Sequence, residues 1–226
     1  MKSVSALWAI APRAVAEAIE ECHDAAIADT LKFLEQEAAF TRTGTNGVAQ
    51  VDTTGLIAAA FTHRDSRAGD PDLHTHVAIS NKVRTADGRW LALDGTPLYR
   101  ITVAASELYN SRLEAHLGNR LGVAFAATEP AGRGKRPVRE IVGLQPELLT
   151  RWSARRAMIE ARTDELTKQF QATHGREPTN IESIALARQA TMESREAKHE
   201  PRSLAEQRQT WRAQAIDVLG DAPSQR

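Results

Sequence analysis

The spacing of apolar residues changes near residue 142, and this change constrains the fold more than any other feature of the chain. Before it, strand-like runs and turn residues are mixed with segments of helical spacing; after it, helical spacing dominates. This order predicts an α+β fold: a mostly antiparallel sheet packed with helices, followed by an all-helical C-terminal extension. We therefore expect a core domain at residues 1–142 and a helical domain at residues 143–226.

Apolar residues at three- and four-residue steps predict a long helix from Pro12 to Leu34, and another over 98–117 with Gly118 near its C-cap. Turn residues predict a hairpin of 39–42 with 48–51, and Asp87-Gly88 predicts a turn between the strand 74–83 and Trp90–Leu93. The run 56–61 predicts a buried strand. Three further helices are expected in the C-terminal extension: one over 145–170, one from about 180 and one from about 204.

Charge is balanced overall, with 29 basic and 29 acidic residues, but it is unevenly distributed. Residues 12–37 are acidic and residues 130–156 are basic. The basic segment could meet phosphate backbones, and a solvated loop followed by a solvated helix start is the competing interpretation. A single cysteine, Cys22, excludes an internal disulfide framework. The single cysteine suits a reducing compartment, so a cytoplasmic protein is expected. No apolar run reaches membrane-spanning length, so no membrane partner is expected.

Three histidines carry the chemistry that the sequence predicts. His74 and His76 are two residues apart, so on a strand their imidazoles point to the same face, and His63 ends the preceding strand. If the two strands lie close in one sheet, three imidazoles meet and suit a catalytic divalent cation. Asp65, Ser66 and Asp70 could orient the ring N–H groups. Two surface histidines and an unrelated third are the competing interpretation.

The remaining polar signals are weaker. His23, His116, His174 and His199 lie on helical patterns or at helix ends and are interpreted as structural or solvated. Trp152 and Trp211 have the spacing of helix core residues. The run that begins at Gly132 lacks the spacing of a phosphate-binding loop, so no ATP use is expected.

The stretch from Phe61 through the three histidines to Trp90 resembles the metal-site segment of conjugative relaxases of the TrwC-like (MobF) type, in the histidine–hydrophobe–histidine endonuclease superfamily. Residues 2–9 resemble the strand that precedes the family's first long helix. The helix 99–118 with Tyr109, and the tail around Leu204 and Trp211, are similar as well. The resemblance covers most of the chain.

This resemblance implies an enzyme that nicks and rejoins one DNA strand at a transfer origin by transesterification, with a tyrosine as nucleophile. His63, His74 and His76 would hold the metal, Mg²⁺ or Mn²⁺ in use. The partner would be single-stranded DNA at a transfer origin. Basic side chains suited to its phosphates are Arg64, Arg67, Arg133, Lys135 and Arg136, and a solvated charge is the competing interpretation for each.

The sequence departs from the family pattern at its start. The family's nucleophilic tyrosines and an orienting Asp precede the Lys-Ser-Val-Ser segment, but here Met1 stands directly before Lys2. Tyr99 and Tyr109 belong to a later helical region and are interpreted as packing residues. The expectation is an N-terminally truncated relaxase core that nicks poorly or not at all, with a separate relaxase fragment or accessory relaxosome proteins as partners. Gene decay, a wrong start codon and a split gene all stay open.

Two other functions stay open. The chain could be a non-catalytic remnant that binds origin DNA or a partner relaxase. It could also be an unrelated metal-dependent hydrolase that uses a bound water, although the long run of similar residues beyond the histidines disfavours this alternative.

Overall fold

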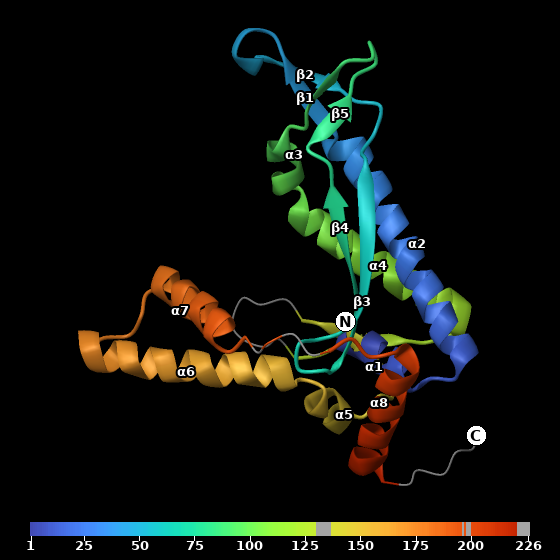
Figure 1. Cartoon of the computed structure of the whole chain (residues 1–226), viewed down its shortest axis with the longest axis vertical. Helices are drawn as coiled ribbons and strands as arrows, with labels where there is room; N and C mark the ends of the chain where they lie inside the picture. The colour runs from blue at the N-terminus through green and yellow to red at the C-terminus, as the bar shows by residue number, and fades with distance from the viewer. Residues whose placement is uncertain (130–136, 196, 198–199, 221–226) are drawn as a thin grey trace. The chain divides into compact units, whose positions relative to one another are not determined.

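The structure, a computed structural model, describes residues 1–129, 137–195, 197 and 200–220. It is an α+β fold with a helical C-terminal region, as the sequence predicts, and the strands described pair in four two-stranded sheets (Figure 1). The chain divides into two compact units. The first contains residues 1, 11–63 and 74–142, and the second contains residues 2–10, 64–73 and 143–226.

Two long helices form the core of the first unit. Helix α2 (Arg13–Ala38) packs against α4 (Thr102–Leu121), and the apolar stripe of α2 includes the fully buried Ile19. From α4, Leu113 and Leu117 are buried as well. Burial of each such side chain stabilises the fold by about 1.5–3 kcal/mol. The long helix predicted after Pro12 is confirmed.

The second predicted helix of this unit is divided. It consists of α3 (Gly95–Arg100) and α4, separated by Ile101, whose φ of −96° and ψ of 6° are not helical. Helix α4 continues through Gly118 and ends at Leu121, with Gly122 as its C-cap. Gly122 adopts a φ of 69°, which glycine reaches without a steric penalty, and its N–H donates to the Gly118 carbonyl at 2.9 Å.

Both predicted turns form hairpins. The antiparallel pairs are β1 (Phe40–Thr43) with β2 (Ala49–Asp52), and β5 (Lys82–Arg84) with β6 (Trp90–Ala92). Between β1 and β2, the short 3-10 helix η1 (Thr45–Gly47) places Asn46 at a φ of 58°, a conformation that Asn tolerates. The buried Thr41 hydroxyl donates to the Ala92 carbonyl at 2.6 Å and so ties the two hairpins together.

Strands β3 (Ala58–Asp65) and β4 (Pro71–Ile79) form the sheet that carries the histidines. Their short connection requires antiparallel pairing, because parallel strands need a crossover of a dozen or more residues. The prediction of a buried strand over 56–61 is wrong: β3 begins at Ala58, and Phe61 is 55% exposed. A two-stranded sheet has few neighbours to cover it, and a short apolar run does not by itself report burial. The predicted strand 74–83 is divided into β4 and β5.

A fourth strand pair closes the first unit. Strand β7 (Phe125–Ala127) pairs antiparallel with β8 (Arg139–Ile141). The basic residues predicted between them, at positions 133, 135 and 136, lie outside the described residues.

The second unit contains a helix where the family resemblance implied a strand. Residues Lys2–Ile10 form α1, so that expectation is wrong. Six of its nine residues are buried, including Trp8, whose ring lies 5.5 Å from that of Trp211. Apolar and small residues on successive helical turns suit a helix covered by its neighbours, and α1 contacts α5 (Pro146–Arg151) and α8 (Leu204–Leu219).

The helix predicted over 145–170 is also divided, into α5 and α6 (Ala154–His174), at Trp152 and Ser153. Helix α6 continues past the predicted 170 to His174 and is capped by Gly175, which has a φ of 65°. Helix α7 (Asn180–Glu193) packs on α6.

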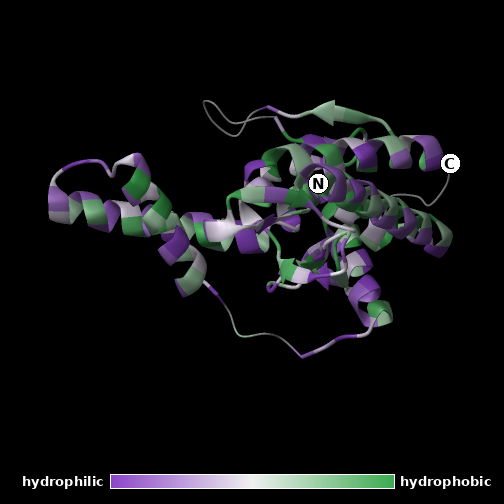
Figure 2. Ribbon diagram, turned by 90° about the horizontal axis from the view of Figure 1, so that it is seen from above, coloured by the Kyte–Doolittle hydropathy of each residue, from purple (hydrophilic) through white to green (hydrophobic). Residues whose placement is uncertain are grey.

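Helices α7 and α8 begin where the sequence predicts, because each has a capping box. The Thr179 side chain accepts from the backbone N–H of Glu182, and the Ser203 side chain accepts from that of Glu206. Hydrophilic residues recur along the helices (Figure 2), and among the described residues no helix is long and apolar enough to cross a membrane.

Candidate metal centre

The three predicted histidines meet in the first unit. His63 is on β3, and His74 and His76 are on β4. The ring centroids lie 5.2 Å apart for His63 and His74, 4.9 Å for His63 and His76, and 5.1 Å for His74 and His76. One ring nitrogen of each residue lies within 4.8 Å of those of the other two. The pairing of the strands therefore brings together the side chains that the spacing predicts to share a face.

The cluster fits a divalent cation in its donor set and its accessibility. Three nitrogen ligands about 2.0–2.1 Å from one ion would lie closer together than the 4.8 Å limit found here, so small side-chain rotations would complete the coordination. His63 and His76 are exposed and His74 is half-buried, so an ion and a substrate oxygen could reach the nitrogens from solvent. Three ligands also leave positions open, as catalytic metal sites require.

Polar residues between the strands have other partners in the second unit. The Ser66 hydroxyl accepts from the backbone N–H groups of Ala68 and Asp70. The Asp65 carboxylate accepts from Arg202 at 3.2 Å and from Gln207 at 2.8 Å. These bonds hold the turn and helix α8, so the expectation that Ser66 orients an imidazole finds no support.

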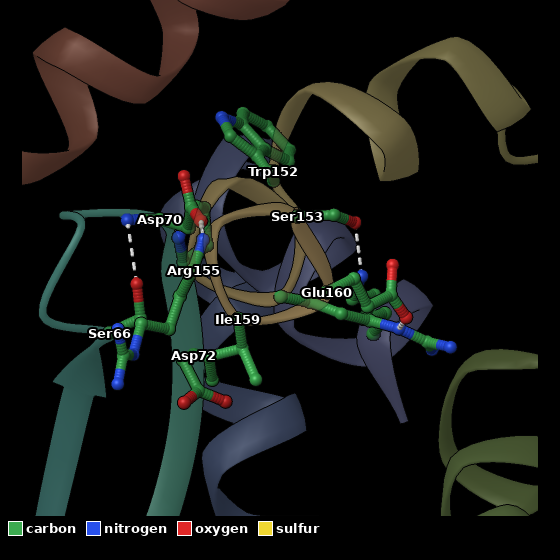
Figure 3. Close-up of a pocket in the computed structure, with 11 residues that line it drawn as sticks. Ser66, Asp70, Asp72, Trp152, Ser153, Arg155, Ile159 and Glu160 are labelled. Atoms are coloured by element: carbon green, nitrogen blue, oxygen red, sulfur yellow. Dashed lines mark hydrogen bonds and ion pairs between the residues drawn. The ribbon is translucent and has the colours of Figure 1, made fainter. Parts of the chain in front are cut away.

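The Asp70 side chain, from the turn before β4, lies next to the first residues of helix α6. It lines a pocket of about 340 Å³ together with Trp152 and Ile159 (Figure 3). Its carboxylate accepts from the backbone N–H of Arg155 at 3.4 Å, where the N-cap residue of α6 provides no side-chain bond. Burial raises the pKa of Asp70, against the opposing effect of these backbone N–H groups. Asp70 is thus a buried helix cap, not a group that orients the histidines.

The predicted DNA contacts are only partly described. Arg64 follows His63 on β3, and Arg67 lies in the turn before β4; both are half-exposed. The other three residues of this set, Arg133, Lys135 and Arg136, lie outside the described residues.

Of the other histidines, one has a role that sequence reasoning missed. His116 pairs with Asp29 at 3.0 Å, and the His174 ring stacks on Phe170, as expected of structural residues; His199 lies outside the described residues. His23, however, is buried and its Nε2 lies 2.9 Å from the hydroxyl of Thr75, the residue between two of the clustered histidines. The position of His23 on the apolar stripe of α2 could have indicated from the sequence that this histidine is buried.

Neither tyrosine of the chain resembles a nucleophile. Tyr99 is 85% exposed on α3, so its interpretation as a packing residue is wrong. Tyr109 lies on α4 with its hydroxyl 2.6 Å from His23 Nδ1, and burial raises its pKa to about 12. A phenol is activated by a lowered pKa or by an adjacent base that takes its proton. Burial raises the pKa of Tyr109 and also lowers the pKa of the adjacent His23, so this imidazole is a weak base for the phenol.

The sequence model of the TrwC relaxase family matches residues 1–218. The chain belongs to the TrwC relaxase family. Among solved structures, it is similar to the conjugative relaxase TrwC in complex with oriT DNA in a copper-bound form, with a TM-score of 0.76 and 27% identity over 96% of this chain and 68% of that one. A metal-bound TrwC complex with oriT DNA has the same TM-score and identity and is covered to 69%.

A further TrwC structure, complexed with a 27-mer DNA comprising the recognition hairpin and the cleavage site, matches with a TM-score of 0.75, 27% identity, and coverage of 96% of this chain and 70% of that one. The multifunctional conjugation protein TraI of Escherichia coli is 33% identical over 91 residues, which are 40% of this chain. That match spans 5% of the length of TraI.

Proposed function

We propose that this chain provides the metal centre and part of the DNA-binding surface for relaxase chemistry, the nicking and rejoining of single-stranded DNA at a transfer origin. The observation that carries the proposal is the cluster of His63, His74 and His76 in a chain of the TrwC relaxase family. Relatives of known structure that share its fold hold metal and oriT DNA.

His63, His74 and His76 would each donate one ring nitrogen to the cation and leave its remaining positions to oxygen ligands. When bound, a divalent cation there would polarise a phosphate oxygen and offset the charge of the transition state. We propose Mg²⁺ or Mn²⁺ as the ion in use. Three imidazoles also accept softer ions, so selectivity would come from availability and from the oxygen ligands.

For DNA, we propose that Arg64, which follows His63 in the sequence, and Arg67 contact phosphates, together with Arg133, Lys135 and Arg136. Guanidinium groups suit phosphates because their N–H donors match the oxygens in pairs. Neutralised phosphates release counterions, so affinity for single-stranded DNA should fall with salt. Replacing the three residues at 133, 135 and 136 with Ala should flatten that salt dependence, and an unchanged slope would remove them from the surface.

The covalent step requires a tyrosine that these residues do not supply. Tyr99 is 85% exposed on α3, and Tyr109 is hydrogen-bonded to His23 and has a raised pKa. We therefore propose that this chain alone binds metal and DNA but nicks poorly or not at all. The alternative is a non-catalytic module that holds origin DNA or a partner relaxase. It is favoured by the same observation, that neither tyrosine suits a nucleophile.

The test combines three measurements on the chain. Fluorescence anisotropy reports the affinity for single-stranded origin DNA, calorimetry reports Mn²⁺ binding, and denaturing gels report nicking and any covalent protein–DNA adduct on supercoiled plasmid. We expect Mn²⁺ and DNA binding without an adduct. Any adduct formed by the parent chain would contradict the proposal that it lacks a nucleophile. If the adduct persists in the variant Tyr99→Phe/Tyr109→Phe, neither tyrosine is the nucleophile. If the variant loses the adduct, the interpretation of these two tyrosines is wrong as well.

The metal proposal has its own control. The variant His63→Ala/His74→Ala/His76→Ala should not bind Mn²⁺, whereas His174→Ala, at an exposed histidine on α6, should bind it as the parent chain does. Hydrolysis of simple phosphodiesters by the parent chain, without an adduct, would instead favour a metal-dependent hydrolase.

A further inference from the structure

Behind the three imidazoles, hydrogen bonds connect the histidine strands to both long helices of the first unit. Side chains alternate between the two faces of a strand. Thr75 therefore points away from the face that carries His74 and His76, and Thr62 points away from the face that carries His63. The two threonine hydroxyls lie 3.0 Å apart.

We propose that Thr75, His23 and Tyr109 form a hydrogen-bond relay that positions the three imidazoles for metal binding. The inference rests on the metal centre proposed above and adds positioning residues to it. None of the three would touch the ion; each would act through the strands that hold the ligands.

The relay is continuous from helix α4 to strand β3. Tyr109 Oη lies 2.6 Å from His23 Nδ1, and His23 Nε2 lies 2.9 Å from Thr75 Oγ1. Thr75 Oγ1 then lies 3.0 Å from Thr62 Oγ1. The His23 and Tyr109 rings meet edge to face, with centroids 5.8 Å apart and an interplanar angle of 90°, so contact between the rings also fixes the imidazole.

The environment gives the relay one direction. Burial raises the pKa of Tyr109 to about 12 and lowers the pKa of His23, so the phenol keeps its proton and the imidazole is neutral at neutral pH. A neutral imidazole has one donor and one acceptor. We assign the phenol as donor to Nδ1, which leaves the proton on Nε2 to be donated to Thr75. The Thr75 hydroxyl can then donate to Thr62.

This arrangement fixes two things that a three-histidine site needs: the register of β3 with β4, and the position of β4 on helix α2. The bond between Thr62 and Thr75 crosses from β3 to β4 and so holds His63 in register with the other two ligands; a slip by one residue would turn it to the opposite face. The bond to His23 ties β4 to α2, which is packed against α4. An exposed two-stranded sheet is only marginally stable without such attachments.

The decisive variant is Thr75→Val, which keeps a branched side chain of similar shape but removes the hydroxyl. Co²⁺ is the probe, because its visible spectrum reports coordination geometry as well as affinity. We expect the dissociation constant for Co²⁺ to rise about 10- to 100-fold, the range found for residues that orient metal ligands. The spectrum should change as well. Thr75→Ser, which keeps the hydroxyl, should restore both.

Thr53→Val is the matched control. Thr53 also lies in the first unit, and its hydroxyl donates to the Ala39 carbonyl, so the variant loses one hydrogen bond that is not part of the relay. It should bind Co²⁺ as the parent chain does. Normal affinity and an unchanged spectrum in Thr75→Val, with Co²⁺ binding still lost in His63→Ala, would overturn the relay and leave the metal centre standing. No Co²⁺ binding by the parent chain would overturn both.

A second measurement examines the relay without metal. Nitrogen-15 NMR of the imidazoles should show His23 in the neutral form protonated on Nε2, and Tyr109→Phe should shift it toward a mixture of tautomers. His23 protonated on Nδ1 in the parent chain, or a spectrum unaffected by Tyr109→Phe, would overturn the direction assigned to the relay. If Thr75→Val does not fold, the Co²⁺ affinity and spectrum of the milder Tyr109→Phe variant test the relay in its place.

Discussion

Strands β3 and β4 and helices α1 and α8 differ in how their residues are held. The strands carry the three histidines, and most of the β3 side chains are exposed. In the helices, Trp8 and Trp211 are fully buried against each other, and the Trp211 indole N–H donates to the Gly69 carbonyl at 2.8 Å. The side chains proposed for chemistry thus lie on strands that are largely exposed or half-buried, whereas the tryptophans that stabilise the second unit lie buried on helices.

This difference teaches that metal affinity and stability should be separable by mutation in this chain. Loss of His63 or His76 should remove a ligand and cost little stability, because an exposed imidazole buries little area. Loss of a buried tryptophan should cost stability and leave the ligands in place. Each prediction below tests one side of this separation.

The largest effect should come from Trp211→Ala. Truncation removes a fully buried ring and its hydrogen bond, so we expect the free energy of unfolding to fall by about 3–5 kcal/mol. Urea denaturation followed by tryptophan fluorescence and circular dichroism measures it. Met192→Ala, at a residue that is 65% exposed on α7, should change it by less than about 0.5 kcal/mol. A loss below 1 kcal/mol in Trp211→Ala would show that the tryptophan pair is not the core of its unit.

His63→Ala should have the next largest effect, on metal rather than on stability. Removal of one of three nitrogen ligands should weaken Mn²⁺ or Co²⁺ binding by about 100-fold or more, because only two imidazoles remain. Titration calorimetry measures the affinity, and denaturation without metal measures the stability, which should match that of the parent chain. A stability loss as large as that of Trp211→Ala would break the proposed separation.

A smaller effect is expected at the start of α8. Ser203→Ala removes the side-chain oxygen that accepts from Glu206 N–H at 3.2 Å, so the unfolding free energy should fall by about 1 kcal/mol. The control is Thr210→Ala, where an exposed hydroxyl bonds only within the helix. Equal stability of the two variants would mean that local capping does not set the start of α8.

The smallest effect should appear at Asp70 and should depend on pH. Because burial raises the pKa of Asp70 above its usual 3.8, folding favours the protonated form, and the carboxylate lowers stability at neutral pH. Asp70→Asn keeps an acceptor for the Arg155 N–H, so it should unfold at slightly higher urea concentration than the parent chain at neutral pH. The difference should vanish as the pH falls through the raised pKa to below 3.8. A variant that is less stable at neutral pH would show that the charge stabilises α6.

The sequence predicted those features that local patterns specify. Capping residues at Thr179 and Ser203 fixed the starts of α7 and α8, and turn residues fixed both short hairpins. The spacing of His74 and His76 placed two ligands on one face, and the strand pairing then brought in His63. In each case the chemistry of a few neighbouring residues decides the structure.

What the sequence did not predict depends on contacts between distant residues. The segment Lys2–Ile10 is a helix because it is covered by α5 and α8, and a short apolar run cannot distinguish this from a buried strand. The exposure of β3 depends on which elements cover it. His23 reaches Thr75 across 52 positions of sequence, so its partner could not be read from helical spacing alone.

The central claim is that His63, His74 and His76 hold one cation together, and imidazole NMR during a Zn²⁺ titration tests it most directly. With resonances assigned by single His→Ala variants, we predict that these three imidazoles shift together and saturate at about one ion per chain. The His116 and His174 resonances should stay unchanged. Independent shifts of the three rings, or saturation at different Zn²⁺ ratios, would contradict the claim.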